Sequence, residues 1–456
     1  MMRIRNLMLL LIAFIAAPMF AARGSANFTT FVAIGDSYGA GIESGSLNLN
    51  HQPFSWPAVI ARQAGVADFQ QPLVTFPGIG SELQLVDILR FPPTILPATG
   101  TATPINLNLP RPYNNLSVPG ATVTDVITLT GKEQPTSTAK VFGQFILRGL
   151  GTEVDQAILQ KPTFIAIWIG GNDALGAVLA GTPAVLTPLD TFRTSYNAML
   201  DKLIAGAPSA GMVVGNIPNN VKALPYLTTV APFLIDPATQ RPVKGPNGQP
   251  IFFVADLGGG TIGQLDANSL VLLPAAAKIA TGFGIPAALA RIPPFNQLPN
   301  IGKPLADTDV LTKAEQAVIK QRVDDFNTVI QQAAAQRDIP VADVKTLFDL
   351  VANGLFVGPI PINAAYITGG FFSLDGFHLT DIGYTLFADV FIDTINNNYR
   401  TQIPIAPLSQ FLANNIPMTT SGFVFVPGSP YEISSEAAAQ MQSFAPKVRR
   451  GRVVPH

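Results

Sequence analysis

The sequence predicts an α/β domain in which helices cover both faces of a parallel sheet. Short, wholly apolar runs such as Phe164–Ile169 are typical of strands that are buried on both sides. These runs alternate with amphipathic segments such as Thr312–Arg337, where apolar residues recur at helical spacing. This alternation favours one decorated three-layer α/β/α domain over two independent domains.

The composition agrees with a large core and limits the classes of function. Hydrophobic residues make up 48% of the 456 residues and charged residues only 12%, so wholesale disorder is not expected. The formal net charge of −1 gives no general attraction to nucleic acid or to an anionic membrane. The chain has no cysteine, which excludes disulfides and a cysteine nucleophile. An imidazole base has three candidates: His51, His378 and His456.

Residues 1–26 read as a secretory signal peptide. Two arginines make the start basic, Leu7–Phe20 is apolar, and small residues follow at Gly24–Ala26. The apolar run is too short for a membrane-spanning helix, which disfavours an uncleaved anchor. We expect cleavage near Ala26 and a mature chain that is secreted, periplasmic or bound at the cell surface.

Strands are expected where apolar and β-branched residues run together, and helices where such residues recur three or four apart or follow a capping residue. The predicted strands are Phe28–Ile34, a short one within 113–121, Phe164–Ile169, Met212–Ile217 and Ile339–Val344. The predicted helices are 55–65, a start at 123–128, 141–159, 189–205, 312–337, 345–353, 381–398 and 434–443.

Two regions rich in proline and glycine interrupt this alternation of strands and helices. The predicted domain covers residues 27–400, with insertions at about 69–112 and 218–304. Within the second insertion, the apolar segment Leu270–Pro294 either forms a flap or acyl-binding wall or simply buries itself against the domain. Residues 401–456 form a C-terminal extension whose basic end we interpret as a solvated tail rather than a membrane contact.

Polar residues and glycines follow the apolar runs at four places. Ser37 follows the first strand, Gly120 ends the second, and Asn172 follows the third. Asp375 and His378 lie three residues apart in a loop before the helix at 381–398. Each alone is an ordinary turn or capping residue. Because parallel strands bring their carboxyl ends to one edge of a sheet, these residues are expected to meet there.

Together these residue types meet the needs of acyl transfer. A serine hydroxyl becomes a good nucleophile when an imidazole takes its proton, and a carboxylate on the other ring nitrogen orients the imidazole. We assign these roles to Ser37, His378 and Asp375. The negative oxygen of the intermediate needs hydrogen-bond donors, which the Ser37 and Gly120 N–H groups and the Asn172 amide can supply. Activity is expected to fall in acid as His378 protonates.

The four segments resemble the sequence blocks of the GDSL, or SGNH, hydrolase family in the family's order. The segments are Gly35-Asp36-Ser37-Tyr38, Asn115–Ala121, Gly170-Gly171-Asn172-Asp173 and Asp375-Gly376-Phe377-His378. The resemblance implies a flavodoxin-like three-layer fold and hydrolysis of carboxylic esters without a cofactor or metal. It also implies the triad and oxyanion residues named above. Tyr38 replaces the usual leucine, and Leu379 replaces a frequent proline.

Other functions remain as alternatives. The favoured function is an exported esterase or lipase that acts on a small-molecule, lipid or glycan ester. The alternatives are an O-acetyl esterase acting on polysaccharide and a catalytically silent relative that binds a ligand or partner. Asp256–Thr261 resembles a phosphate-binding loop, but a hairpin with a loop is the simpler interpretation. The sequence leaves acyl length and oligomeric state open.

Overall fold

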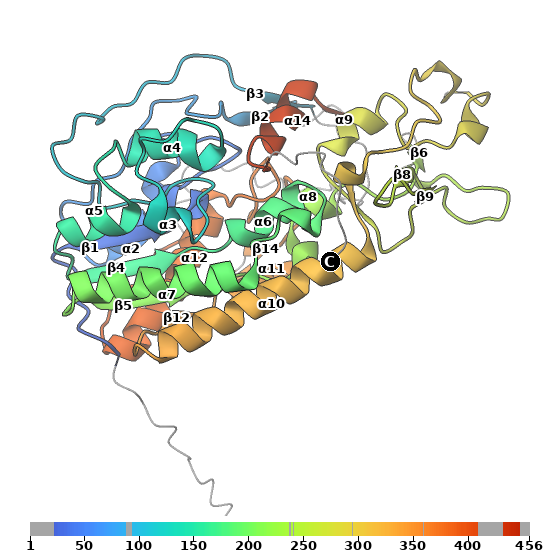
Figure 1. Cartoon of the computed structure of the whole chain (residues 1–456). Coiled ribbons are helices and arrows are strands. Elements are labelled where there is room, and N and C mark those ends of the chain that lie inside the picture. The colour runs from blue at the N-terminus through green and yellow to red at the C-terminus, as the bar shows by residue number, and fades with distance from the viewer. Residues whose placement is uncertain are drawn as a thin grey trace, which may run out of the picture.

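The computed structural model describes residues 22–87, 94–236, 239, 241–293, 295–358, 360–408 and 432–446. Its centre is a four-stranded parallel sheet with the strand order β1-β4-β5-β12 (Figure 1). The strands are β1 (Phe31–Gly35), β4 (Phe164–Trp168), β5 (Gly211–Gly215) and β12 (Val341–Ala342). The predicted parallel α/β architecture is confirmed.

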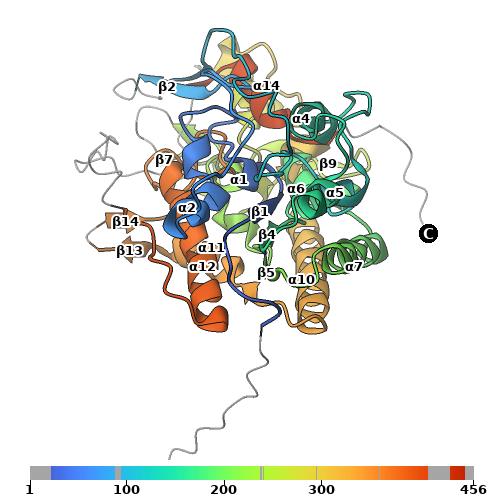
Figure 2. The same cartoon turned by 90° about the vertical axis from the view of Figure 1, so that its left-hand side faces the viewer.

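The sheet is buried on both faces, which explains its unbroken apolar strands. Phe31 and Ala33 of β1 pack into one hydrophobic cluster, whereas Val32 and Ile34 pack into another. This alternation follows from the two-residue period of a strand. Figure 2 shows the two helical layers on opposite sides of the sheet. One layer contains α2 (Trp56–Gln63), α11 (Val344–Asn353) and α12 (Asp381–Tyr399), and the other contains α5 (Glu153–Leu159), α7 (Leu189–Gly206) and α10 (Lys313–Ala335).

The predicted single helix at 141–159 is wrong. The chain forms two helices there, α4 (Thr138–Ile146) and α5 (Glu153–Leu159). Between them, Arg148, Gly149 and Gly151 have positive φ values of 53°, 72° and 118°, which an α-helix does not allow. The apolar periodicity continues across this break because both helices pack against the same cluster.

The first insertion contains regular structure that its composition did not predict. β2 (Leu83–Asp87) and β3 (Thr94–Pro97) form an antiparallel pair. The C-terminal β15 (Glu432–Ile433) then pairs with β3 in parallel. The predicted short strand within 113–121 is reduced to one parallel bridge between Asn115 and Ala33.

The second insertion has an apolar cluster of its own. Val271 and Ala275 pack into this cluster. Leu272 and Leu273 instead pack into the sheet cluster that contains Phe31. This part of the Leu270–Pro294 segment is therefore buried against the domain, as the second interpretation held. At the loop that resembles a phosphate site, Asp256 Oδ1 itself accepts hydrogen bonds from the Gly258 and Gly260 N–H groups, at 3.0 and 3.1 Å.

The remaining elements are short. The helices are α1 (Ser37–Ala40), α3 (Asp125–Thr128), α6 (Asn172–Leu179), α8 (Pro225–Thr228), α9 (Ala275–Ile279) and α14 (Ser435–Gln442). The strands are β6 (Ile235–Asp236), β7 (Arg241–Pro242), β8 (Val254–Asp256), β9 (Ile262–Gln264), β10 (Leu270–Val271), β11 (Val310–Leu311), β13 (Leu355–Val357) and β14 (Ile360–Ile362).

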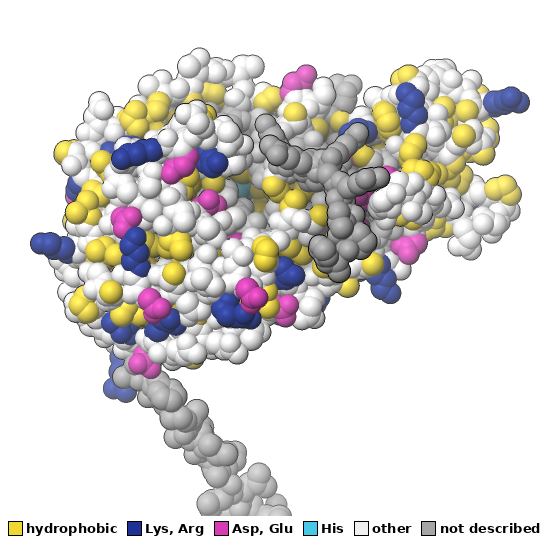
Figure 3. All heavy atoms as spheres, in the orientation of Figure 1, with side chains coloured by type: hydrophobic (Ala, Val, Ile, Leu, Met, Phe, Trp, Pro, Cys, Tyr) yellow, Lys and Arg dark blue, Asp and Glu magenta, His cyan; other side chains and the backbone are white. Residues whose placement is uncertain are grey.

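Most of the predicted leader, residues 1–21, lies outside the described residues. From Arg23 onward the chain already contacts the domain, since its N–H donates to Asp338 O at 2.8 Å and Ser25 pairs with Ala210. Within the described ranges, no helix combines the length and the apolar character needed to cross a membrane. Figure 3 shows positive and negative side chains dispersed over one face without a large patch of either sign.

Candidate active site

Ser37 begins α1 immediately after the carboxyl end of β1. Asp36 caps this helix by accepting a 3.0 Å hydrogen bond from the Tyr38 N–H, and Gly41 ends it with a φ of 81°. A position in the first turn leaves the Ser37 N–H without a partner inside the helix. The strand–turn–helix geometry therefore presents both the hydroxyl and the N–H of Ser37 at the edge of the sheet.

The segment that contains Gly120 runs beside β1. The Leu116 and Val118 N–H groups donate to the carbonyls of Ala33 and Gly35, each at 3.0 Å. Gly120 then turns with a φ of 82°, and a Cβ placed on it would lie 3.0 Å from the Ala139 nitrogen. A glycine is required here both for the backbone conformation and for the close approach of α4.

Asn172 begins α6 directly after β4 and lies next to the Gly120 turn. Its Nδ2 donates to the Ala121 carbonyl at 3.0 Å, which leaves its second amide hydrogen available. Asp173 accepts a 3.0 Å bond from the Val123 N–H and holds the two loops together. Ser37 and Asn172 line one cavity of about 60 Å³. The structure thus brings together the candidate nucleophile and a candidate oxyanion donor.

Asp375 and His378 form a fully buried pair. Asp375 Oδ2 lies 2.7 Å from His378 Nδ1 and also accepts a 2.6 Å bond from the Gly45 N–H. Asp375 Oδ1 accepts from the Phe377 and His378 N–H groups at 3.1 and 2.9 Å. Burial alone would raise the pKa of Asp375, but the His378 charge and these donors hold that pKa below its usual value. The pair is built to keep Asp375 ionised.

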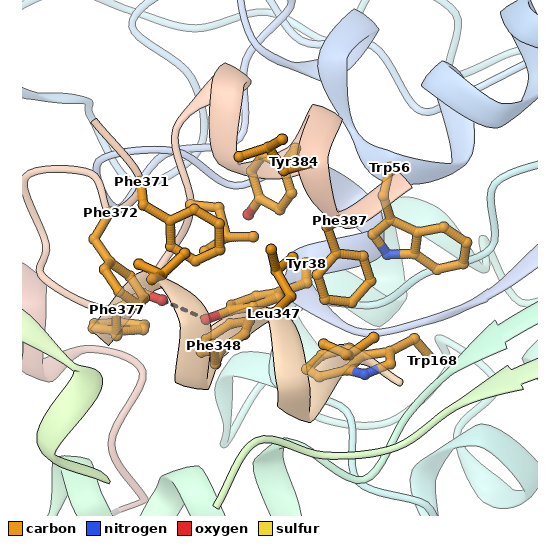
Figure 4. Close-up of a cluster of buried hydrophobic side chains, with 14 of the residues drawn as sticks. Tyr38, Trp56, Trp168, Leu347, Phe348, Phe371, Phe372, Phe377, Tyr384 and Phe387 are labelled. Atoms are coloured by element: carbon orange, nitrogen blue, oxygen red, sulfur yellow. Dashed lines mark hydrogen bonds between the residues drawn. The ribbon is translucent and has the colours of Figure 1, made fainter. Parts of the chain in front are cut away.

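His378 Nε2 is buried and has no hydrogen-bond partner among the described residues. Its hydrogen bond to Ser37 Oγ is therefore not formed in this structure. A short link nevertheless holds their neighbours together, because the Tyr38 hydroxyl donates to the Phe377 carbonyl at 2.5 Å. Figure 4 shows Tyr38 at the centre of buried aromatic side chains, with this bond as a dashed line. Catalytic hydrogen bonds often tighten only when substrate binds.

Buried carboxyl groups lie directly behind the loops of Ser37 and Asn172. Burial raises the pKa of Asp36 to about 8 and that of Asp173 to about 7. Burial also raises the pKa of Glu153 well above its usual value, while its Oε2 accepts a 3.1 Å bond from the Gly35 N–H. Asp36 accepts from the Tyr38 N–H and Asp173 from the Val123 N–H. The support from Glu153 was not predicted, because no local pattern links it to β1.

His51 is occupied elsewhere. Its ring nitrogens lie 3.2 Å from Glu43, 3.1 Å from Asp381 and 3.2 Å from Glu82. Burial alone would lower the pKa of His51, but these carboxylates raise it well above its usual value. Glu43, His51 and Asp381 are the one group in the described ranges whose ligand atoms lie within 4.8 Å of one another, as a metal would require. Hydrogen bonds and close contacts between the His51 ring and these carboxyl groups hold the cluster together.

Solved structures that match this chain include a phospholipase, an acetylxylan esterase and a lipase. Phospholipase A1 from Streptomyces albidoflavus has 16% identity and a TM-score of 0.32, with 82% of this chain and 100% of that chain covered. An acetylxylan esterase from Geobacillus stearothermophilus, solved as a catalytic mutant, has 12% identity and a TM-score of 0.34 over 82% and 95%. An extracellular lipase from Streptomyces rimosus has 15% identity and a TM-score of 0.34 over 80% and 99%.

Among curated proteins, no sequence matches this chain. A family model does match, over residues 31–391, and its description is GDSL-like lipase/acylhydrolase. This range begins at β1 and ends within α12, so it contains the loops of Ser37, Gly120, Asn172, Asp375 and His378. The predicted resemblance is confirmed, and the chain belongs to the GDSL-like lipase/acylhydrolase family of ester hydrolases.

Proposed function

We propose that the protein hydrolyses carboxylic esters through a covalent acyl-Ser37 intermediate. The observation that supports this best is the Asp375–His378 pair. One ring nitrogen is held at 2.7 Å by a carboxylate, and the other is buried and unpaired within the described structure. A histidine with only a structural role would be expected to bond through both nitrogens, as His51 does.

In this mechanism, Ser37 Oγ attacks the ester carbonyl carbon while its proton passes to His378 Nε2. The tetrahedral intermediate collapses, the bond to the alcohol oxygen breaks, and the alcohol leaves with that proton. Water then attacks the acyl group, gives a proton to His378, and releases the acid and a reprotonated Ser37. Asp375 accepts the Nδ1–H bond throughout and stabilises the imidazolium.

The negative oxygen of each tetrahedral intermediate would be bound by three donors. These donors are the N–H groups of Ser37 and Gly120 and the second amide hydrogen of Asn172. The Ala121 carbonyl orients that amide at 3.0 Å before substrate arrives. Donors that are already in place need no reorganisation during the reaction, and one such donor is worth about 10²–10³ in kcat.

The cavity beside Ser37 is suited to a short acyl group. Apolar side chains dominate its lining, including Leu175, Val178, Ile319 and Val323. Its volume of about 60 Å³ is small beside the roughly 300–1,000 Å³ of pockets for drug-sized ligands. The lining favours hydrocarbon over sugar, and the volume favours acetyl to butyryl groups. The same small volume keeps an O-acetyl esterase acting on polysaccharide as the second candidate.

The test is hydrolysis of aryl esters of increasing acyl length by the wild type and by Ser37→Ala. We expect Ser37→Ala to lose nearly all activity and its labelling by a fluorophosphonate. Ser209→Ala is the control, because Ser209 is exposed at the opposite end of the sheet, before β5. Equal activity in Ser37→Ala, or labelling of the wild type at another serine, would contradict the mechanism. A catalytically silent binder would hydrolyse none of the esters.

We also propose that the protein acts outside the cytoplasm. The support is the sequence of the leader, a basic start followed by the apolar run Leu7–Phe20. Replacing Leu10 with arginine breaks this run without changing the described domain. Export predicts that the wild type is found processed outside the cytoplasm and that Leu10→Arg is retained unprocessed. Equal distribution of the two proteins would refute export.

A further inference from the structure

The C-terminal segment Ser434–Pro446 returns to the catalytic end of the sheet. The strand just before it, β15, extends the β2–β3 pair, and α14 makes up most of the segment itself. Figures 1 and 2 both show α14 near β2 and β3, far from the end of α12. Ala437 and Met441 of α14 are buried, so the helix is docked through an apolar face.

The end of this segment lies on the candidate base. The Phe444 ring centroid is 4.9 Å from that of His378 and 5.8 Å from that of Phe377, and both contacts are edge-on. Phe444 packs against the apolar clusters on both faces of the sheet. It therefore bridges the two clusters at the His378 ring.

The same segment contacts the loops of the other candidate residues. The Ser443 carbonyl accepts a 2.9 Å bond from the Thr138 hydroxyl, and Thr138 contacts the Gly120 turn. A Cβ placed on Gly176 of α6, one turn after Asn172, would lie 3.2 Å from the Pro446 ring. Residues 443–446 thus contact the His378 ring, the start of α4 beside the Gly120 turn, and α6 one turn after Asn172.

A polar anchor joins α14 to Gly45, four residues after the end of α1 at Gly41. Gln440 Nε2 donates to the Gly45 carbonyl at 3.3 Å and also to the Ser81 carbonyl. The Gly45 N–H in turn donates to Asp375. Displacement of α14 would therefore loosen Gly45, the residue whose N–H donates to the triad carboxylate.

The result is a closed catalytic centre. Ser37 is 2% exposed, and Asp375 and His378 are fully buried. An ester must reach Ser37 Oγ, and its alcohol must take a proton from His378 Nε2, which is buried beside the Phe444 ring. We propose that Ser434–Pro446 is an autoinhibitory cover, with Phe444 as its plug over His378, and that it moves aside before a substrate binds. This inference rests on the proposed esterase mechanism.

The attachment of the cover is weak enough to be reversible. β15 contributes two residues to its sheet, and Phe444 is only partly buried. The core helix α12, by contrast, has ten buried residues along its length. Segments with few buried contacts open locally at much lower free energy than the core. The cover can therefore leave while the parallel sheet remains folded.

The first test removes the plug in the full-length chain. We expect Phe444→Ala to raise the fluorophosphonate labelling rate of Ser37, and kcat/KM for a soluble aryl ester, by about tenfold through a larger open fraction. The control is Phe356→Ala, because Phe356 is 72% exposed on β13, outside the cover and the site. An unchanged or lower rate in Phe444→Ala overturns the proposal.

The second test locks the cover in place. Because the chain has no cysteine, Gly176→Cys with Pro446→Cys introduces one pair, at the point where a Cβ on Gly176 would lie 3.2 Å from the Pro446 ring. We expect oxidation of the double variant to reduce labelling and hydrolysis at least tenfold, and a reductant to restore both. Each single variant should respond to neither reagent. A cross-link that is verified by mass spectrometry and leaves the rate unchanged overturns the cover.

These outcomes separate the two proposals. If labelling depends on Ser37 but is unaffected by Phe444→Ala and by the cross-link, the esterase mechanism is supported and the autoinhibitory cover is refuted. If labelling and hydrolysis persist in Ser37→Ala, the mechanism is refuted, and the cover proposal, which rests on it, is refuted as well.

Discussion

The Tyr38 hydroxyl donates a 2.5 Å hydrogen bond to the Phe377 carbonyl. The two residues are 339 positions apart, and each is adjacent in sequence to a proposed catalytic residue, Ser37 or His378. The bond therefore ties the loop of the nucleophile to the loop of the base. Tyrosine at this position contributes a polar link that the leucine usual in the family could not make.

Tyr38→Phe removes this bond and keeps the ring. We expect a three- to tenfold lower kcat with little change in KM, because the loops of Ser37 and His378 are no longer held in a fixed relative position. The unpaired Phe377 carbonyl should cost about 1–3 kcal/mol of stability. Tyr113→Phe is the control, since it removes a hydroxyl that bonds the Asn106 carbonyl on a surface insertion. Steady-state kinetics and urea unfolding provide the measurements, and equal kcat in both variants would contradict the positioning role.

Asp375→Asn keeps the size of the side chain and removes its charge. An amide has one acceptor oxygen where the carboxylate has two. It therefore cannot accept from Nδ1–H, the Gly45 N–H and the two backbone donors at once, and the imidazole would not be held in its present tautomer. We expect kcat to fall by about 10³–10⁴, as in other Ser-His-Asp sites. The measurement is single-turnover hydrolysis of an aryl ester, with circular dichroism to check folding. A loss below tenfold would argue against Asp375 as the orienting acid.

Gly120→Ala tests the second oxyanion donor. The new Cβ would lie 3.0 Å from the Ala139 nitrogen and 3.1 Å from Thr138 Cβ, at a φ of 82°. The turn must shift, so we expect kcat to fall about 10²-fold with little change in KM. Gly65→Ala is a matched control, since Gly65 has a φ of 72° but nothing within 4 Å of the added Cβ. Both variants should lose stability, about 1 kcal/mol for Gly65→Ala, but only Gly120→Ala should lose activity.

Val323→Ala should shift the preferred acyl length upward. Val323 on α10 lines the 60 Å³ cavity, and its truncation adds room along the path of the acyl chain. We expect the ratio of kcat/KM for octanoyl over acetyl aryl esters to rise about five- to tenfold, which is roughly 1–1.4 kcal/mol. Val318→Ala, at an exposed position of the same helix, should leave this ratio unchanged. An unchanged ratio of kcat/KM values in Val323→Ala would show that this cavity does not bind the acyl group.

The buried Asp36 predicts a loss of stability with rising pH. Burial, with the Asp173 charge adding to it, raises the pKa of Asp36 to about 8, whereas an unfolded aspartate ionises near pH 4. Between these values the folded state binds more protons than the unfolded state, so the free energy of unfolding should fall as pH rises from about 4 to 8.

Asp36→Asn should remove part of this slope, because an amide does not ionise but can still cap α1. Urea unfolding at pH 5 and pH 8 measures the effect. Asp190→Asn is the control, since the Asp190 side chain is 90% exposed. A wild-type slope in Asp36→Asn would show that this carboxyl does not carry the pH dependence.

The features that could be predicted from the sequence are those that neighbouring residues specify. The strands at Phe31–Gly35 and Phe164–Trp168 were recognisable because burial on both faces requires an unbroken apolar run. The turn after each strand was recognisable from its glycines and short polar residues. Parallel strands end at a common edge, so the meeting of Ser37 with Asn172 also followed from local patterns.

Contacts between distant segments could not be predicted in this way. The spacing of apolar residues continues across the break at Arg148–Gly151, because the helices on either side pack against the same cluster. The break itself was therefore not recognisable from this spacing. The Tyr38–Phe377 bond joins side chain and backbone across most of the chain, and neither residue carries a local signature of the other.

The parallel α/β domain and the identity of the residues proposed for chemistry could be predicted from local sequence alone. Their types and order are local properties, and only His378 among three histidines follows a carboxylate at a useful spacing. The burial of Asp375 and His378 as a pair, and the contact of Phe444 with the His378 ring, are visible only in the folded chain. Access to a site depends on which distant segment packs over it, and that packing is set by the path of the whole chain.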